Sequence, residues 1–255
     1  MNQFSRTEML IGREGILRLK SASVIVFGLG GVGSYAAEAL ARSGIGRIGI
    51  VDGDSVCVTN INRQLIATHS TFGKQKTEVM RKRIIDINPK AKVIPFDIFY
   101  DAETCDQVDL TEYDYVLDAI DTVESKLLLI ENARAAGAPI ISCMGAGNKL
   151  DATGFKVANI SETAYCPLAK IMRRELRDRG IESLKVVYSE EAPMQAADSA
   201  SGESMPDICE YEPFCEPCPS CKREGARRAP GSVPFVPPVM GLIAAGEVIK
   251  DLLLL

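Results

Sequence analysis

Short apolar runs and amphipathic segments alternate along most of the chain. Apolar runs flanked by polar or turn-forming residues predict β-strands at 24–27, 48–51, 91–96, 115–120, 139–143, 154–160 and 184–189. Apolar residues at helical spacing predict helices at 1–20, 32–43, 74–87, 123–136, 166–179 and 237–255. The alternation of strand and helix predicts an α/β fold with a doubly wound, mostly parallel sheet.

Two stretches depart from this pattern. Residues 97–114 are acidic, and we expect a helix and loop on the surface there. Residues 192–228 follow no period and are rich in Ala, Ser, Gly, Glu and Pro, which is typical of a long irregular loop. We therefore predict a single domain over 1–255, with a core at 20–190, an irregular loop at 192–228 and a C-terminal helix at 237–255.

The first predicted strand leads into Gly28, Gly30 and Gly33 and then directly into a helix. In this order the first glycine permits a tight turn, the second lets the backbone approach a phosphate, and the third lets the helix pack close to the strand. The N–H groups and the positive dipole end of the helix would face the anion. The second strand ends at Asp52, where a carboxylate can accept hydrogen bonds from ribose hydroxyls. Together these features predict a nucleotide site, which the glycine pattern alone would not.

The loop after Asp52 carries the polar side chains that distinguish between nucleotides. They are Asp54, Asn60, Asn62, Arg63, Gln64 and, in the first turn of the next predicted helix, Lys76. Arg63 and Lys76 suit a triphosphate better than the pyrophosphate of a dinucleotide, because cations neutralise the charge that develops as a nucleotidyl bond is exchanged. A cation in the first turn of a helix also hints at a compensating anion. Taken singly, either side chain is more typical of a solvated surface cation.

Two carboxylates mark the end of the strand predicted at 115–120. Asp121 lies just past it, at the edge where open parallel sheets bind ligands. Mg²⁺ commonly takes one or two carboxylates together with phosphate oxygens. We therefore expect Asp121 to bind Mg²⁺, whereas Asp118 could equally cap the next helix.

Composition and charge narrow the functional classes. With 46% hydrophobic residues the chain can bury a full core, and its net charge of −5 gives no global attraction to nucleic acid or anionic membrane. The absence of Trp and the scarcity of Tyr and Phe argue against a stacking surface for single-stranded nucleic acid. The N-terminus lacks the regions of a signal peptide and no apolar run approaches about 18 residues, so we expect a cytoplasmic protein without a membrane span.

Four of the eight cysteines cluster in the irregular loop, namely Cys209, Cys215, Cys218 and Cys221. Their thiolates could close a Zn²⁺ or iron–sulfur site, could be redox or structural thiols, or could have no role. They could also include a thioester nucleophile, but the single His69 leaves no obvious imidazole activator. Cys57, Cys105 and Cys143 stand alone, and we expect them to fill core or loop positions.

Several segments resemble the adenylating domain of the ubiquitin-activating-enzyme-like superfamily, a Rossmann-like domain of the ThiF/MoeB type. Its bacterial members include the adenylyltransferases of molybdopterin and thiamine biosynthesis. The matching segments are GLGGVGS, VDGDSVCVTNINRQ, GKQK and the DAID at 118–121. Within the superfamily, FSRTEMLIGREG, SCMGAGNKLD at 142–151 and VVYSEE at 186–191 look most like the tRNA threonylcarbamoyladenosine dehydratases. The match fails only near 198–228.

The resemblance implies a role for each matching position. The ribose and phosphates of ATP would be held by Asp52, Asn60, Arg63 and Lys76. Asp121 would bind Mg²⁺, and Arg6 would reach the phosphates of the partner subunit in a homodimer. The two CxxC pairs, far apart in sequence, that hold structural zinc in the adenylyltransferase branch are absent here, so that zinc site does not carry over.

The same resemblance gives the basic residues a candidate role. The predicted helix at 166–179 holds the densest cationic cluster, Lys170, Arg173, Arg174, Arg177 and Arg179. An ordinary solvated helix face would look the same, but in a protein that acts on tRNA this cluster is the first candidate for the phosphate-backbone contact. Lys149 could meet a substrate carboxylate, the transferred phosphate or the tRNA, or be a solvated loop lysine.

By this resemblance the chain would use ATP and Mg²⁺ to activate the carboxylate of the threonylcarbamoyl group on a tRNA adenosine, and then close a ring with net loss of water. An alternative is activation of the C-terminal glycine of a ubiquitin-like sulfur-carrier protein, and a sulfur-transfer partner could assist. A third alternative is a non-catalytic regulator that binds a dinucleotide or AMP. Such a protein would not need Arg63, Lys76 and Asp121 together, which suit a triphosphate and a metal ion. Gly241 and Gly246 indicate close packing of the final helix, which fits a homodimer.

Overall fold

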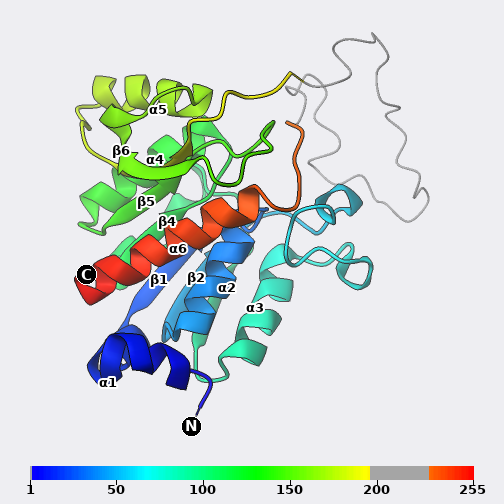
Figure 1. The fold of residues 1–255 in the computed structure, drawn as a ribbon, viewed down its shortest axis with the longest axis vertical. Coiled ribbons are helices and arrows are strands. Elements are labelled where there is room, and N and C mark those ends of the chain that lie inside the picture. Colours follow the sequence, from blue (N-terminus) through cyan, green and yellow to red (C-terminus); the bar gives the residue numbers. More distant parts are fainter. Residues whose placement is uncertain (1, 196–229) are drawn as a thin grey trace.

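A seven-stranded sheet runs through the centre of the protein (Figure 1). The computed structural model describes residues 2–195 and 230–255. The strands are β1 (Ser23–Phe27), β2 (Arg47–Val51), β3 (Lys92–Phe96), β4 (Tyr115–Asp118), β5 (Ile140–Cys143), β6 (Phe155–Asn159) and β7 (Lys185–Ser189). Their order is β3-β2-β1-β4-β5-β7-β6, and every neighbouring pair is parallel except β6 with β7. The prediction of a doubly wound, mostly parallel sheet is confirmed.

Helices cover both faces of the sheet. They are α1 (Ser5–Ser21), α2 (Gly33–Ser43), α3 (Lys76–Ile87), α4 (Val123–Ala135), α5 (Pro167–Asp178) and α6 (Pro237–Leu253). On one face α2, α3 and α6 pack against strand residues such as Val24, Val26 and Ile48. On the other face α4 packs against Ile25 and Phe27, and α4 and α5 share a further apolar cluster. The central strand β1 is buried over its whole length because it is covered from both sides.

The direction of winding reverses at β1. The chain passes from β1 to β2 and β3 on one side, and then crosses to β4 on the other side of β1. Phe27, the last residue of β1, is in register with Asp118, the last residue of β4. Open α/β sheets bind ligands beyond the carboxyl ends of the strands at such a reversal. The switch point therefore lies between the glycine turn and the segment that carries Asp121.

The acidic stretch at 97–114 differs from the prediction. We expected a helix and loop on the surface there, but in place of the helix the stretch has two short 3₁₀ turns, Cys105–Gln107 and Leu110–Glu112. Val108, Leu110 and Tyr113 are buried beneath the sheet. The spacing of these three residues suits a series of turns that packs along the sheet. The acidic side chains between them face water.

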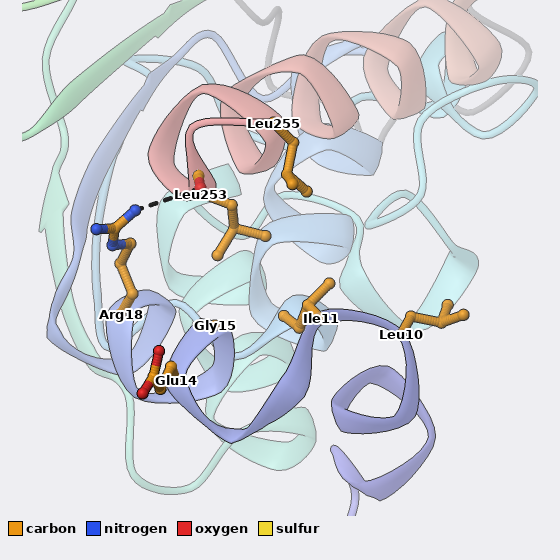
Figure 2. A pocket seen from close by; sticks show the side chains of 7 residues that line it. All are labelled: Leu10, Ile11, Glu14, Gly15, Arg18, Leu253 and Leu255. Atoms are coloured by element: carbon orange, nitrogen blue, oxygen red, sulfur yellow. Dashed lines mark hydrogen bonds between the residues drawn. The ribbon is translucent and has the colours of Figure 1, made fainter.

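The N-terminal helix lies at the amino edge of the sheet, beside the end of α6 (Figure 1). It was predicted as one helix, and it breaks at Gly12, which has φ of 72°. A pocket of about 330 Å³ lies between α1 and the C-terminus of α6, where Arg18 Nη1 donates to the carbonyl of Leu253 (3.3 Å; Figure 2). Its position at the amino edge separates it from the switch point. The lining residues are Leu10, Ile11, Glu14, Gly15, Arg18, Leu253 and Leu255.

The C-terminal helix packs within its own chain. A Cβ at Gly241 would lie 2.2 Å from the carbonyl oxygen of Val32, so this glycine lets α6 cross close over the start of α2. Gly246 has open space around it among the described residues, so packing within the chain does not require a glycine there, and its packing against a partner subunit stays a prediction. In the described part of the chain, no helix combines the length and the apolar character needed to span a bilayer.

Candidate active site

The glycine turn joins β1 to α2 at the switch point. Gly28 has φ of 84°, and its N–H donates to the carbonyl of Val51 (2.8 Å). A Cβ at Gly33 would lie 1.8 Å from the carbonyl oxygen of Gly28, so only glycine lets the helix begin this close to the turn. The protein's own packing therefore explains both of these glycines.

Gly30 is different, because packing among the described residues does not require it. A Cβ there would meet only Nε2 of Gln64, at 3.7 Å, which is an ordinary contact. The Oε1 of Gln64 is buried and has no hydrogen-bond partner among the residues that the structure describes. An unsatisfied buried acceptor is costly. A nucleotide lying against Gly30 would account for the missing side chain and could supply the missing donor.

Asp52 follows β2 and is held by backbone groups. Its Oδ2 accepts from the N–H of Leu29 (2.6 Å), and its Oδ1 accepts from the N–H of Asp54 (2.8 Å). Lys76, the first residue of α3, lies 2.9 Å from Asp54 Oδ2 and 3.7 Å from Asp52 Oδ1. Burial raises the pKa of Asp52, while the Lys76 ammonium and the two N–H groups oppose that rise. The anion that compensates Lys76 at its helix start is, in this structure, the carboxylate of Asp54.

Arg63 lies against the glycine turn from the other side. A Cβ at Gly31 would lie 3.3 Å from Arg63 Cγ, and Arg63 Nη1 donates to the carbonyl of Thr59 (3.0 Å). Burial lowers the pKa of Arg63, and the Asp121 carboxylate opposes this change. The charges of the guanidinium and of this carboxylate are therefore close enough to interact.

Asn60 lies on the same loop, at the end of a 3₁₀ turn, Val58–Asn60. It is buried, and its Oδ1 accepts from the N–H of Cys57 (3.1 Å). This bond fixes the loop, and a contact of Asn60 with a phosphate stays a prediction. Sequence reasoning predicted Asn60 as a ligand residue, and the structure gives it a supporting role in the loop as well.

Asp121 is exposed just past β4, and its carboxylate makes no hydrogen bond or ion pair within the described ranges 2–195 and 230–255. An open carboxylate at this place fits one protein ligand of Mg²⁺. Across the same ranges, no three side chains of His, Cys, Asp or Glu are grouped so as to hold a metal ion. A magnesium ion here would take its other ligands from phosphate oxygens and water.

A buried cluster supports this edge from below. Asp118 Oδ2 lies 2.8 Å from Lys126 Nζ and accepts from the hydroxyl of Ser142 (2.6 Å), and all three side chains are fully buried. Lys126 also donates to the carbonyls of Ile120 (3.0 Å) and Cys143 (2.8 Å). Asp118 therefore does not cap the next helix, as one of our two interpretations held. The cluster instead ties the end of β4 to the end of β5.

Sequence reasoning missed Lys126. A signal was present, because Lys126 falls on the same helical face as Leu129, Ile130 and Ala133, which are buried. A lysine on an apolar face indicates a buried acceptor opposite it.

Lys149 is buried, with 3% of its surface exposed, so it is not a solvated loop lysine. Its ammonium donates to the backbone carbonyl of Glu191. The carboxylate of Glu191 in turn accepts from the N–H groups of Leu150 (2.9 Å) and Asp151 (3.0 Å). The two segments whose sequences resembled the dehydratases, 142–151 and 186–191, are thus joined at the carboxyl edge. A contact of Lys149 with substrate stays a prediction.

The basic residues of α5 divide into two groups. Arg173 Nη1 donates to the carbonyl (2.6 Å) and hydroxyl (2.8 Å) of Thr163, and so holds the loop before the helix. Arg174 pairs with Glu175 (2.8 Å) but keeps 64% of its side chain exposed. Lys170 and Arg177 are exposed and have no ion-pair partner in the described part of the chain.

The remaining candidates lie elsewhere. Arg6 is exposed on α1 at the amino edge, across the sheet from the site of its own chain. Cys57 and Cys143 are buried as expected, and burial raises the pKa of the Cys143 thiol to about 12, which makes it a poor nucleophile. The cluster that lies outside the described residues consists of Cys209, Cys215, Cys218 and Cys221.

Comparison with known proteins agrees with this geometry. The model of the ThiF family matches residues 4–254. A tRNA threonylcarbamoyladenosine dehydratase from Bacillus subtilis is 45% identical over 254 residues, which covers 99% of this chain and 95% of that protein. The dehydratase of Escherichia coli is 34% identical over 259 residues, covering 98% and 93% of the two chains.

Solved structures of the Escherichia coli enzyme, TcdA, have the same fold. Its complex with AMP superimposes with a TM-score of 0.83, and its complex with ATP with a TM-score of 0.80. In both cases the sequences are 32% identical, and the match covers 99% of this chain and 94% of the other. These similarities extend over the switch point, the loop that carries Arg63 and the C-terminal helix.

Proposed function

The chain belongs to the ThiF family, and from this premise we propose that it is an ATP-dependent tRNA threonylcarbamoyladenosine dehydratase. The observation that carries the proposal is 45% identity to such an enzyme over the full length of both chains. The geometry agrees with it, because an open glycine turn, two cations and a carboxylate meet at one switch point. ATP binding is supported by the ATP and AMP complexes of the Escherichia coli relative.

The chemistry has two steps. A carboxylate oxygen of the threonylcarbamoyl group attacks the α-phosphorus of ATP, and the bond to the β-phosphate breaks and releases pyrophosphate. The acyl-adenylate then reacts with a nitrogen or oxygen of the same modification, which closes a ring, loses its proton to solvent and expels AMP. The modification has lost one water, and the reaction needs no protein nucleophile.

The protein's part is to bind and orient these groups. Asp52 would hold the ribose, and Gly30 would let the backbone approach the phosphates. Arg63, Lys76 and Asn60 would bind the phosphates, and the two cations, Arg63 and Lys76, would neutralise the charge that builds up as pyrophosphate leaves. Holding the carboxylate and the α-phosphate in line supplies much of the remaining acceleration. Lys76 would have to exchange part of its contact with Asp54 for the nucleotide.

Mg²⁺ is expected to accompany the triphosphate. Asp121 would hold it, because its carboxylate is open and lies near Arg63 at the nucleotide edge. When bound, the ion would neutralise phosphate charge. A Zn²⁺ or iron–sulfur site at the four clustered cysteines stays a hypothesis about residues outside the described ranges.

We also propose that the active form is a homodimer in which Arg6 of one subunit reaches the phosphates of the other. Within one chain, α1 lies at the opposite edge of the sheet, so Arg6 can serve the site only from a partner. A cytoplasmic location and help from a sulfur-transfer protein remain expectations.

Two alternatives make different predictions. An adenylyltransferase for a sulfur-carrier protein would form AMP and pyrophosphate only with that carrier, and full-length identity to dehydratases argues against it. A passive AMP-binding regulator would release no pyrophosphate with any acceptor.

The test is to measure AMP and pyrophosphate release with tRNA that carries threonylcarbamoyladenosine and with tRNA that lacks it, alongside mass spectrometry of the digested nucleosides. The proposal expects release only with the modified tRNA and a nucleoside lighter by one water. Release that ignores tRNA, or an unchanged nucleoside mass, would overturn it.

A further inference from the structure

The loop before α5 holds a tyrosine in a backbone conformation that side chains avoid. Tyr165 has φ of 60°, and the N–H of Cys166 donates to the carbonyl of Ala164 (2.7 Å) across it. A three-residue turn with positive φ at its centre is rare and strained. Glycine or asparagine would occupy this position at lower cost than an aromatic residue.

Packing among the described residues does not explain the choice of tyrosine. Tyr165 is 74% exposed, and its side chain makes no hydrogen bond or ring contact with the described residues. Strained conformations of this kind persist mainly where they serve a function. An exposed ring that is held in a strained turn and that no described residue contacts fits a site for an external ligand.

The turn lies next to the candidate active site. Gly145 belongs to the loop that follows β5 at the carboxyl edge of the sheet. A Cβ at Gly145 would lie 3.9 Å from Cys166 Sγ and 3.8 Å from Leu168 Cβ. The neighbouring strand, β4, leads to Asp121. Tyr165 is thus placed beside the same edge as the nucleotide site, where α5 begins.

From this turn a line of cations runs along the helix. Lys170, Arg174 and Arg177 follow each other at helical spacing on the solvent side of α5. The opposite side of the helix is buried, with Ala169, Met172 and Leu176 in the core. Lys170 and Arg177 are unpaired within the described ranges, and Arg174 remains largely exposed. An exposed aromatic ring at the site edge, continued by cations, matches a polyanion with unpaired bases.

We propose that this α5 surface, consisting of Tyr165, Lys170, Arg174 and Arg177, binds the anticodon arm of the tRNA substrate. The Tyr165 ring stacks on an unpaired base next to the modified adenosine, and the three cations contact phosphates of the stem. Proteins recognise RNA loops by stacking splayed bases on aromatic side chains. The inference rests on the proposed function and adds the residues that select the RNA. The scarcity of aromatic residues argued against an extended stacking surface. The proposal needs only one aromatic ring, which stacks on a single base at this turn.

The test compares Tyr165→Asn with Tyr165→Phe. Asparagine tolerates positive φ, so Tyr165→Asn removes the ring and keeps the turn, whereas Tyr165→Phe keeps both. The probe is a fluorescent anticodon stem-loop RNA carrying threonylcarbamoyladenosine, with binding followed by anisotropy. We expect Tyr165→Asn to raise the Kd for RNA about tenfold. Tyr165→Phe should stay within about twofold of the wild type, and both variants should keep the wild-type Tm and Kd for ATP.

The cations are tested by their salt dependence. The double variant Lys170→Gln/Arg177→Gln should bind RNA more weakly and reduce the slope of log Kd against log salt by about 1.5 to 2. Lys90→Gln, an exposed lysine between α3 and β3 at the amino edge, is the matched control and should change neither quantity.

The outcomes separate the two levels of the proposal. Wild-type RNA binding that Tyr165→Asn and the double cation variant leave unchanged would overturn the α5 surface and leave the dehydratase function standing. A wild-type chain that neither binds this RNA nor consumes ATP with modified tRNA would overturn both.

Discussion

Lys126 Nζ lies 2.8 Å from Asp118 Oδ2, and neither side chain has any exposed surface. The same ammonium holds the carbonyls of Ile120 and Cys143, at the ends of β4 and β5. Ile120 directly precedes Asp121, the expected ligand of Mg²⁺. A single buried cation therefore fixes the backbone beneath the proposed nucleotide edge and, being fully buried, presents no surface to a ligand.

Lys126→Met should lower the free energy of unfolding by about 3–5 kcal/mol, because it leaves the Asp118 carboxylate buried without its partner. Urea denaturation measures this loss. Lys185→Met is the control: Lys185 pairs with Glu247 and Asp251 but is 30% exposed, so its loss should be about 1 kcal/mol or less.

The double variant Asp118→Asn/Lys126→Met separates stability from positioning. It removes both charges, so we expect much of the lost stability to return. ATP–pyrophosphate exchange should nevertheless stay low and need more Mg²⁺, because the carbonyls of Ile120 and Cys143 are no longer tied. Full activity in a restored double variant would show that the pair serves stability alone.

The glycine turn gives a matched pair of substitutions. Gly30→Ala should fold normally, since its Cβ would meet nothing closer than 3.7 Å, but should weaken ATP binding because the methyl group occupies the phosphate approach. Gly33→Ala should destabilise the fold, since its Cβ would lie 1.8 Å from a carbonyl oxygen. Thermal unfolding and ATP titration distinguish the two. Wild-type affinity in folded Gly30→Ala would count against a phosphate at Gly30.

Arg63→Ala and Lys76→Ala should each reduce ATP–pyrophosphate exchange by about 10²-fold or more, because each removes a charge that stabilises the transition state. Lys74→Ala is the control, since Lys74 is exposed two residues away and its ammonium, among the described residues, donates to the carbonyl of Ser70. Circular dichroism should show that all three variants are folded. Exchange near the wild-type rate in Arg63→Ala or Lys76→Ala would contradict the site assignment.

The lowered pKa of Glu38 predicts how the stability of the protein changes at acid pH. Burial would raise its pKa, but hydrogen bonds from Arg83 and Arg42 outweigh burial and hold the pKa below 4.5, its ordinary value. A carboxyl with a lowered pKa in the folded state contributes its full stability above its unfolded pKa, and loses it as pH falls through the folded pKa. Glu38→Gln should therefore be less stable than the wild type at pH 7, and the difference should shrink below pH 4.5. A constant difference down to pH 3, measured by urea denaturation, would rule this out.

The sheet was predictable because its strands are apolar runs, which parallel strands covered on both faces require. β1, for example, is buried at every position. The stretch at 97–114 was wrongly predicted, since Val108, Leu110 and Tyr113 have a spacing that only the opposing sheet explains. The burial of Lys149 could not be predicted from the sequence, because the carbonyl that accepts from its ammonium belongs to Glu191, 42 residues away.

The glycine turn, Asp52 and Asp121 were predictable because each follows a strand end, and strand ends can be read from the sequence. Their grouping at one switch point depends on the order of the strands in the sheet. In that order β4 lies beside β1, although β2 and β3 come between them in the sequence. The strain at Tyr165 is a backbone angle and has no sequence signal. The cysteine cluster remains a prediction about residues outside the described ranges.

The two edge strands of the sheet, β3 and β6, each carry a residue that opposes pairing with a further strand. β3 contains Pro95, which has no N–H to offer a neighbour, and β6 presents Lys156, which is 57% exposed. Proline and lysine at these places discourage the pairing of an incoming strand. These two residues therefore oppose edge-to-edge joining of copies of the chain into extended sheets, and this protects a parallel, slowly forming fold from aggregation while it is being made.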